Sequence, residues 1–447
     1  MKSLKWIQVL ALSLIAVMVV TACGNSGNTG DSSNISNSGN AGSSNEKSEV
    51  KITLLNSKGE IQAPLEEAAK TFKEDYPNIT LEIIPVPAGQ SPFEKASALY
   101  ASGNPATITM LDTGDVEKFK DRILDLSGEK WMADAVDRST SLTTFDGKNY
   151  AFPLAIEGYG FIYNKAVVDK AVGGSFDPAT INTTNALEEL FKKIEASGKA
   201  PLIISPMDWS LGAHYLPLAY AGQSADTAAV AKFVEDLKAG KVDLASNAVF
   251  NGLIDTFDVM VKYNIDKASP LSGTYERGPE VLGKGEVGIW FQGNWAWPQI
   301  SSFDTASGQY GFLPVPVSNN ADYFGNTQIS SAVSKRLVLD KEKNTAEQQA
   351  AAKTFLEWMV YNDKGQDFLV NKANIIPAFK NVTLEAKDPL AKSISEHIAN
   401  GKTQDSMSTL PADHWAKLGA AMQKYLAGAG DRAELTKEIE DYWKAVK

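Results

Sequence analysis

Cysteine is nearly absent from this chain, which has one in 447 residues, and long hydrophobic runs are scarce. One thiol cannot form an intrachain disulfide, so packing alone must stabilise the folded part. The single apolar run of note, residues 7–20, is too short to span a bilayer comfortably. Basic residues are also in deficit, because 43 lysines and arginines face 54 aspartates and glutamates. This acidic balance argues against nucleic acid and phosphate-rich partners.

Motifs of the common enzyme classes are missing as well. The sequence contains no P-loop, no dinucleotide-binding fingerprint and no nucleophile-elbow motif. The three histidines, His214, His397 and His414, lack metal-ligand spacing, and we expect His214 and His414 to be surface or supporting groups. No cofactor and no metal site are therefore expected. Carboxylates are so numerous that finding a pair suited to glycoside hydrolysis is no evidence for a glycosidase. A membrane-tethered glycosidase therefore stays an alternative.

The one cysteine ends the apolar run, in the order Val-Thr-Ala-Cys that finishes at Cys23. Lys2 and Lys5 give the segment a positive start, and the small residues before the thiol suit a peptidase cleavage site. The segment resembles a bacterial lipoprotein signal peptide over residues 1–22, with Cys23 as the lipidated (palmitate-type) first residue of the mature chain. The alternative is an ordinary secretory signal with an incidental cysteine. Stable anchoring would need at least two acyl chains.

A polar segment follows the cysteine. Residues 24–48 are almost all glycine, serine and asparagine, with Ile35 as the one large aliphatic side chain, so they cannot bury enough apolar surface to fold. Residues 23–48 are therefore predicted to be the lipidated cysteine and a disordered tether, with a span of roughly 25–30 Å from ~5–6 Å × √n. Removal of residues 1–22 would change the formal charge from −11 to about −13.

The remaining body of about 400 residues is too long for one core, so two domains are expected. Its first part alternates between strand and helix patterns, which predicts a parallel sheet with right-handed crossovers. The expected elements are strands at 50–55, 79–86 and 106–111, with a helix from Pro64 to Phe72 and a second helix at 93–101. Ligands bind beyond the carboxyl ends of such strands. Asn56 and Lys58 follow the first strand there, and Asp112 follows the third. Asp115 is the alternative candidate in the loop after the third strand.

The rest of the body is a mixture of strands and helices. An Asp146-Gly147 turn predicts a hairpin, and Asn294 is expected to cap a helix over 295–300. Strands are predicted at 150–153, 161–163, 202–205, 287–291 and 310–317, and helices at 185–197, 225–239, 249–263, 346–361, 364–371, 412–426 and 433–446. The two strands at 150–153 and 161–163 flank a Glu-Gly-Tyr-Gly crossing.

Several motifs, in order, resemble the carbohydrate-binding solute receptors of ABC importers, which are extracellular solute-binding protein family 1 of the maltose-binding-protein type. The resemblance extends from about Val50 to Val446. Its motifs are the run from Gly283 to Trp297, Asp146-Gly147-Lys148 to Phe152-Pro153, Tyr163-Asn164-Lys165, Phe312 to Pro316, Ile329-Ser330, Ser334-Lys335 and Phe355 to Trp358. Each motif alone is weakly specific, whereas their order and spacing together are strongly specific.

The resemblance implies an α/β protein with the two-lobed periplasmic-binding-protein (Venus flytrap) fold, in which two α/β lobes are joined by a hinge of several chain crossings. The implied N-terminal lobe comprises residues 49–155 and 312–360. The implied C-terminal lobe comprises residues 156–311 and 361–447.

Sugars are bound by aromatic rings that stack on their C–H faces and by polar groups that pair with their hydroxyls. The resemblance places Trp295 on the cleft as a stacking platform. On a helix the indoles of Trp295 and Trp297 point about 200° apart, so one can face the cleft while the other packs into the lobe. Trp415 matches a second stacking tryptophan. The alternative for all of these rings is a place in the core, where Trp290 and Trp358 are also expected.

Polar positions are carried over in the same way. Glu157 matches an acidic residue at the lobe crossing, and the segment Asp208-Trp209 matches an acidic-then-aromatic ligand segment. Asn56 and Lys58 match the loop after the first strand. Asp112 falls near a ligand position, although the acidic–basic pair of the family is not evident there. Tyr323, with Phe324 beside it, is expected either at the cleft or in the core.

The function that the resemblance implies is transport without chemistry, so no enzyme activity is expected. A monomeric, lipid-anchored receptor on the extracellular face of a Gram-positive type cell membrane would bind a sugar, with a maltodextrin-like oligosaccharide preferred, and deliver it to ABC transporter permease subunits. The alternatives are a membrane-tethered glycoside-active enzyme and a receptor for a non-sugar solute. An iron receptor would favour a tyrosine pair, whereas a cleft rich in tryptophan favours a neutral ligand that can stack.

Overall fold

The computed structural model describes residues 48–87 and 90–446. The predicted signal peptide (1–22), the lipidated Cys23 and all of the predicted tether except Ser48 lie outside the described residues. Within the described ranges, no helix has the length and apolar character that crossing a membrane requires.

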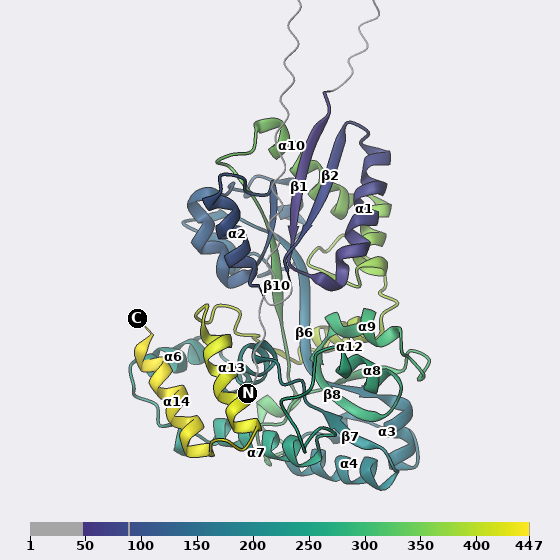
Figure 1. The fold of residues 1–447 in the computed structure, drawn as a ribbon, viewed down its shortest axis with the longest axis vertical. Helices are drawn as coiled ribbons and strands as arrows, with labels where there is room; N and C mark the ends of the chain where they lie inside the picture. The colour runs from purple at the N-terminus through teal and green to yellow at the C-terminus, as the bar shows by residue number, and fades with distance from the viewer. Residues whose placement is uncertain (1–47, 88–89, 447) are drawn as a thin grey trace, which may run out of the picture. The chain divides into compact units, whose positions relative to one another are not determined.

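The first part of the body is the parallel sheet that the sequence predicts. Strand β1 pairs in parallel with β2 on one side and β3 on the other. Helix α1 buries Leu65, Ala68 and Phe72 at helical spacing, and α2 begins with a capping box of Ser91 and Glu94. The bounds are β1 (Val50–Asn56), α1 (Gln62–Asp75), β2 (Ile79–Pro85), α2 (Pro92–Ala101) and β3 (Ile108–Asp112). Figure 1 shows these elements grouped at one end of the ribbon.

Two long antiparallel strands, β6 (Phe152–Asn164) and β10 (Ile329–Leu339), lie in the middle of the sheet order β2-β1-β3-β10-β6-β8-β7. The separate strands expected at 150–153 and 161–163 are thus wrong, because β6 continues through the Glu-Gly-Tyr-Gly segment. Its glycines permit close packing there. A Cβ at Gly160 would lie 2.6 Å from the Leu313 carbonyl oxygen.

Buried side chains form separate cores toward the two ends of these strands. We call the part built on β1–β3 the first lobe and the part built on β7 and β8 the second lobe. Trp358 packs in the first lobe and Trp290 in the second, so the prediction that both are core residues is confirmed. In the described part of the chain, three crossings join the lobes, and each connects residues of the two cores: Phe152 to Phe161, Ile329 to Leu337, and Phe379 to Leu390.

The packing differs from the expected lobe limits at two segments. Phe312, Leu313 and Val315 pack in the second lobe, although 312–360 was expected in the first. Phe368 to Phe379 contribute to the first core, although 361–447 was expected in the second. The first difference arises because the chain returns to the first lobe only along β10, later than the sequence pattern indicates. The second arises because the chain also leaves the first lobe later than expected.

The helices at 165–172, 277–283 and 389–399 were not predicted, whereas the other remaining elements agree with the predicted ones to within a few residues at each end. In the first lobe the remaining elements are the hairpin strands β4 (Thr144–Phe145) and β5 (Lys148–Asn149), α10 (Ala346–Tyr361) and α11 (Asp363–Asp367). In the second lobe they are α3 (Lys165–Val172), α4 (Thr184–Ala196), β7 (Ala200–Ile203), α6 (Thr227–Lys238), α7 (Ala248–Tyr263), α8 (Arg277–Gly283), β8 (Val287–Gly293), α9 (Trp297–Ser301), β9 (Tyr310–Leu313), α12 (Pro389–Ala399), α13 (His414–Leu426) and α14 (Arg432–Ala445).

Asn294 does not cap a helix, so that prediction is wrong. A short 3-10 turn, η8 (Asn294–Ala296), comes first, and α9 begins only at Trp297. The side-chain oxygen of Asn294 instead accepts a hydrogen bond from the backbone N–H of Gly158 in β6, with an N–O distance of 2.9 Å. Asn294 therefore fixes the loop after β8 to the crossing strand.

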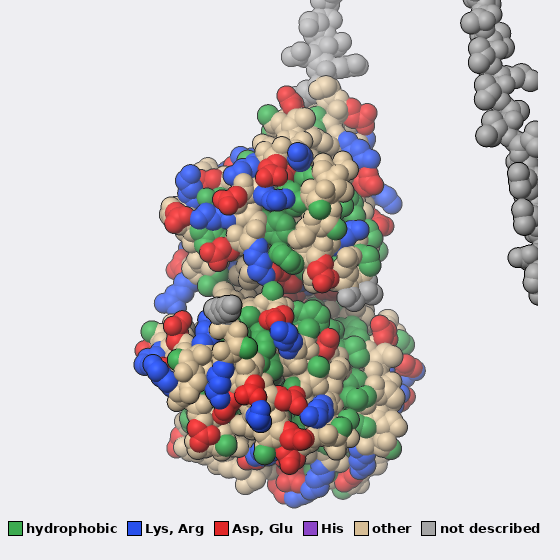
Figure 2. Space-filling view, turned by 60° about the vertical axis from the view of Figure 1, so that its left-hand side comes forward, with side chains coloured by type: hydrophobic (Ala, Val, Ile, Leu, Met, Phe, Trp, Pro, Cys, Tyr) green, Lys and Arg blue, Asp and Glu red, His purple; other side chains and the backbone are tan. Residues whose placement is uncertain are grey.

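The surface carries charges of both signs. Figure 2 shows lysines and arginines intermixed with aspartates and glutamates over the face in view. Some oppositely charged side chains are neighbours on one helix, such as Lys165 and Asp169 of α3 or Lys192 and Glu189 of α4. Exposed pairs of this kind contribute little to stability, so the cores carry most of it.

Candidate ligand-binding cleft

The cleft consists of two adjoining chambers that share Ser91, Asp112, Ser408 and Trp415. The aromatic chamber has a volume of about 580 Å³, and its lining includes Tyr159, Trp209, His214 and Trp295. The acidic chamber has a volume of about 450 Å³, and its lining includes Glu94, Asp115 and Asp413. Both volumes are in the range of small-molecule sites. Residues of the first lobe, the second lobe and the crossing strands all contribute.

Rings gather around His214 in the aromatic chamber. Its imidazole centroid lies 4.8 Å from that of Tyr159, 4.9 Å from Trp295 and 5.5 Å from Trp209. Burial lowers the pKa of His214 to about 4, so the imidazole is neutral near pH 7. Its Nδ1 atom is buried without a hydrogen-bond partner among the described residues. The rings form an apolar wall with one polar group in it.

His214 and His414 were expected to be surface or supporting groups, and neither lies on the surface. His214 belongs to the wall of the aromatic chamber. His414 lines the acidic chamber and is otherwise buried in the second lobe against Tyr220, Tyr442 and Trp443. Single-residue patterns around a histidine do not reveal stacking with rings from other elements, so the sequence offered no signal for this placement.

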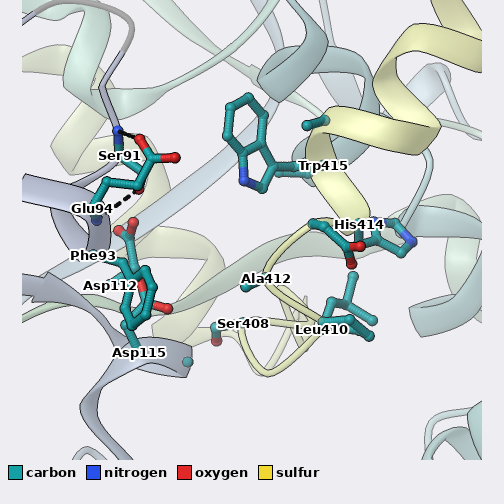
Figure 3. A pocket seen from close by; sticks show the side chains of 15 residues that line it. Ser91, Phe93, Glu94, Asp112, Asp115, Ser408, Leu410, Ala412, His414 and Trp415 are labelled. Atoms are coloured by element: carbon teal, nitrogen blue, oxygen red, sulfur yellow. Dashed lines mark hydrogen bonds between the residues drawn. The ribbon is translucent and has the colours of Figure 1, made fainter. Parts of the chain in front are cut away.

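Trp415 projects from the first turn of α13 and lines both chambers. Figure 3 shows its ring extending into the acidic chamber, opposite the Ser91–Glu94 cap of α2. The position of α13 depends on two glycines, because it packs closely on the π-helical segment η6 (Ser210–Tyr215). A Cβ at Gly212 would lie 2.2 Å from the Trp415 carbonyl oxygen, and a Cβ at Gly419 would lie 2.3 Å from that of Asp208.

Trp295 and Trp297 have different surroundings, as their spacing suggests. Trp295 lines the aromatic chamber, whereas Trp297 packs edge-on against Tyr310 with ring centroids 5.5 Å apart.

Glu157 lies on β6 at the lobe crossing, where two groups of the protein hold its carboxylate. One carboxylate oxygen pairs with the Lys58 ammonium group, and the other accepts a hydrogen bond from the Ser334 hydroxyl. Burial alone would raise the pKa of Glu157, but the charges of Lys58 and Lys335 and these hydrogen bonds lower it below its usual value. Glu157 is therefore ionised, and it lines the aromatic chamber.

Lys58 lies behind Glu157 and lines neither chamber, although it was expected at the ligand. It is 5% exposed, and its ammonium nitrogen also lies 2.6 Å from a Glu60 carboxylate oxygen. Burial alone would lower the pKa of Lys58, but the charges of Glu157 and Glu60 raise it above its usual value. Asn56 is buried too, and its amide donates to the Lys58 carbonyl while its oxygen accepts from the Lys58 N–H. Both residues shape the loop under Glu157.

Asp112 is half of an acidic–basic pair that the sequence did not reveal. Its partner is Lys335, whose ammonium nitrogen lies 2.5 Å from an Asp112 carboxylate oxygen. The two residues are directly opposite in the antiparallel pairing of β3 with β10. They are 223 positions apart along the chain, so only the strand register brings them together.

The other predicted site residues divide between the cleft and the core. Asp208 and Trp209 line the aromatic chamber, where the backbone N–H of Trp209 donates to the Asp208 carboxylate at 2.8 Å. Asp115 lines the acidic chamber, and its carboxylate lies 2.6 Å from the Lys118 ammonium nitrogen. Tyr323 lines neither chamber, because its hydroxyl donates to the Gly222 carbonyl at 2.8 Å and its ring packs on the second core.

The cleft thus combines flat ring faces with carboxylates that accept hydrogen bonds. Rings of this kind bind apolar C–H faces, and ionised carboxylates bind hydroxyl donors. In residues 48–87 and 90–446, no three His, Cys, Asp or Glu side chains are placed to hold a metal ion.

The comparison with protein families identifies the class of this protein. A match to the family described as bacterial extracellular solute-binding protein covers residues 67–397. Because this match extends over most of the chain, the chain belongs to that family of binding proteins, as its motifs predict.

Solved structures with the same fold include several receptors whose ligands are sugars. A raffinose complex of the solute-binding protein RafE has 18% identity and a TM-score of 0.74, covering 88% of this chain and 99% of the other. A chitin oligosaccharide binding protein has 20% identity and a TM-score of 0.71, over 88% and 98%. Maltose-bound MalE3 of T. maritima has 20% identity and a TM-score of 0.67, over 88% and 99%. The two-lobed α/β fold that the sequence predicts is confirmed.

Proposed function

We propose that this protein is an extracellular sugar receptor, with an oligosaccharide as its preferred ligand, that delivers its ligand to the permease of an ABC importer. The observation that carries the proposal is the composition of the cleft, in which Trp209, Trp295 and Trp415 face a space also lined by Asp112 and Asp208. Membership of a solute-binding family and the sugar ligands of structures with the same fold support it.

The ligand site that we propose consists of six of the predicted residues. Trp209, Trp295 and Trp415 stack on sugar rings, and Asp112, Glu157 and Asp208 accept hydrogen bonds from hydroxyls. Lys58 and Asn56 support Glu157 from behind rather than contacting ligand, and Tyr323 has no part in the site.

The proposed mechanism is lobe closure without chemistry. A ligand in this cleft would touch the first lobe at Asp112, the crossing strand at Glu157 and the second lobe at Trp295, so it would bind the closed form more tightly than the open form. The population of the closed form would rise accordingly, and the closed form would dock on the permease. No bond of the sugar is broken in this mechanism.

We also propose that Cys23 anchors the receptor to the outer face of a cell membrane through acyl chains. This part of the proposal is supported by the sequence pattern alone. A receptor on a cell with no outer membrane would diffuse away without an anchor, which gives the cysteine and the tether a role.

The test is calorimetric titration of the full-length chain with neutral sugars, namely raffinose, maltotriose, triacetylchitotriose and xylotriose. We expect saturable binding of at least one sugar, and no product when the mixture is analysed by chromatography. In a Trp295→Ala variant the affinity should fall by about tenfold or more, because the loss of one stacked ring costs about 1–3 kcal/mol by analogy with other stacked ligands.

Trp297→Ala is the matched control, because Trp297 is also half-buried and packs against Tyr310 outside the cleft. It should bind with the affinity of the wild type. Equal affinities of the wild type and Trp295→Ala would disprove the stacking role, and failure of every sugar to bind would disprove the proposed function. Appearance of shorter products would favour the glycosidase alternative.

A further inference from the structure

We infer that Asp112 determines the charge of the sugar that the cleft accepts: by neutralising Lys335 it makes the site select neutral sugars and reject sugars that carry a carboxylate. The inference rests on the proposed function and deepens it by naming a ligand class and the residue that selects it.

The lining of the two chambers is strongly biased towards negative charge. Among the described residues that line them, Lys335 is the one lysine or arginine side chain. The carboxylates that line the chambers are Glu94, Asp112, Asp115, Glu157, Asp208 and Asp413. An anionic ligand could therefore gain a charge-assisted contact here only from Lys335.

Lys335 is not free for such a contact, because Asp112 already holds it. The ammonium nitrogen lies 2.5 Å from the Asp112 oxygen, and Lys335 is 17% exposed while Asp112 is 48% exposed. The carboxylate is thus the more accessible member of the pair, and it lines both chambers. A carboxylate on the ligand would meet a like charge before it reached the lysine, which disfavours binding.

Three other basic side chains at or near the cleft have no charge available to a ligand. Lys58 is buried behind Glu157 and is shared between Glu157 and Glu60. His214 lines the aromatic chamber and His414 lines the acidic chamber, but burial lowers the pKa of each to about 4, so neither carries a charge near pH 7. Neutral hydroxyls can still donate to Asp112 and Asp208, so the same arrangement that rejects an anion accepts a neutral sugar.

Asp112 is distinguished from the other carboxylates by its partner. Asp413 also lines the acidic chamber, but its carboxylate pairs with Lys417, which is 64% exposed, at 2.8 Å. Figure 3 shows Asp112 beside Phe93, across the chamber from Trp415. Removal of the charge of Asp112 would leave an unpaired ammonium group in the cleft, whereas removal of the charge of Asp413 would free only a lysine on the surface.

The experiment compares two forms of one sugar by calorimetric titration of the full-length chain. The neutral form is the tightest binder among raffinose, maltotriose and triacetylchitotriose, which have primary hydroxyls, and the acidic form has one primary hydroxyl oxidised to a carboxylate. We expect the wild type to bind the neutral form about tenfold or more tightly than the acidic form, since a like charge opposes the latter. Added salt should reduce this ratio, because it screens the repulsion.

In Asp112→Asn the ratio should fall by about tenfold or more, because Lys335 becomes available to the ligand carboxylate. Asp413→Asn is the matched control for loss of a lining carboxylate, and it should lower the ratio by less than Asp112→Asn does, because the lysine that it frees lies on the surface. The double variant Asp112→Asn with Lys335→Met should lose the affinity for the acidic form that Asp112→Asn gains, because the ammonium group is gone. Thermal unfolding of each variant checks that it is folded. The ratio of the affinities of the wild type for the neutral and acidic forms tests the inference without any variant.

Equal affinity of the wild type for the two forms would overturn charge selection while leaving the proposed function intact. An equal change of the ratio in Asp112→Asn and Asp413→Asn would overturn the role of Asp112. Failure of the wild type to bind any neutral sugar would overturn the proposed function, and this inference with it.

Discussion

Gly114 of the first lobe lies against the backbone of Ser408 in the second lobe, so one added methyl group there should weaken ligand binding without touching the ligand. A Cβ at Gly114 would lie 2.7 Å from the Ser408 carbonyl oxygen, whereas ordinary contacts begin at 3.4 Å. In Gly114→Ala the two segments must therefore move apart by about 0.7 Å. Overpacking of this kind costs about 1–3 kcal/mol.

The cost falls only on the conformation in which the lobes touch, so it should appear in binding rather than in folding. A closed form destabilised by about 1.4 kcal/mol binds about tenfold more weakly, and larger penalties scale accordingly. Calorimetry with the best sugar measures this loss, and small-angle scattering with saturating sugar should show a less compact particle than the wild type. Thermal unfolding without sugar should be unchanged, because an open form avoids the contact.

Gly128→Ala is the matched control, because a Cβ at Gly128 meets nothing within 4 Å. It should have the affinity of the wild type. Wild-type affinity in Gly114→Ala, with an unchanged scattering profile, would show that the contact does not limit closure and would refute the reasoning.

Other perturbations have equally definite expectations. Glu157→Gln removes one of the two carboxylates that pair with the buried Lys58 and leaves Glu60, so the free energy of unfolding should fall by about 1–3 kcal/mol in denaturant titrations. Burial lowers the pKa of His214 in the folded state, so the protein should lose stability as the pH falls below the unfolded-state pKa near 6.5. In His214→Gln the difference in the free energy of unfolding between pH 7 and pH 5 should be smaller by about 2 kcal/mol. An unchanged pH dependence of the free energy of unfolding in this variant would refute the burial of a neutral imidazole. Gly160→Ala should destabilise the hinge by about 1–3 kcal/mol in thermal unfolding, because its Cβ would meet the Leu313 carbonyl.

The elements of the first lobe were predictable because their signals are local. Alternating apolar residues in β1 and the helical spacing of Leu65, Ala68 and Phe72 in α1 each follow from a dozen neighbouring residues. The hairpin at Asp146-Gly147 was equally local, and both residues have positive φ, 52° and 77°.

The unpredicted parts of the cleft depend on contacts between distant segments. Lys335 joins Asp112 only through the register of β3 and β10, and nothing in the sequence around either residue indicates the other. The sequence around His214 does not reveal its surroundings, because two of the rings next to it, Tyr159 and Trp295, come from other elements. The burial of Lys58 depends on Glu157, which lies 99 positions away.

Packing also decided where a lobe begins and ends. The Pro-rich segment after β9 reads as part of the strand that returns to the first lobe, but Val315 and Val317 are buried in the second core. A local pattern predicts that such residues are buried, whereas only the tertiary fold determines which core they join.

The most direct test of the account is a crystal structure of the protein with its tightest neutral sugar. The account predicts sugar rings against the faces of Trp295 and Trp415, hydroxyls within hydrogen-bond distance of the carboxylates of Asp112 and Asp208, and contacts from both lobes. A sugar bound outside the two chambers, or held by one lobe alone, would contradict it.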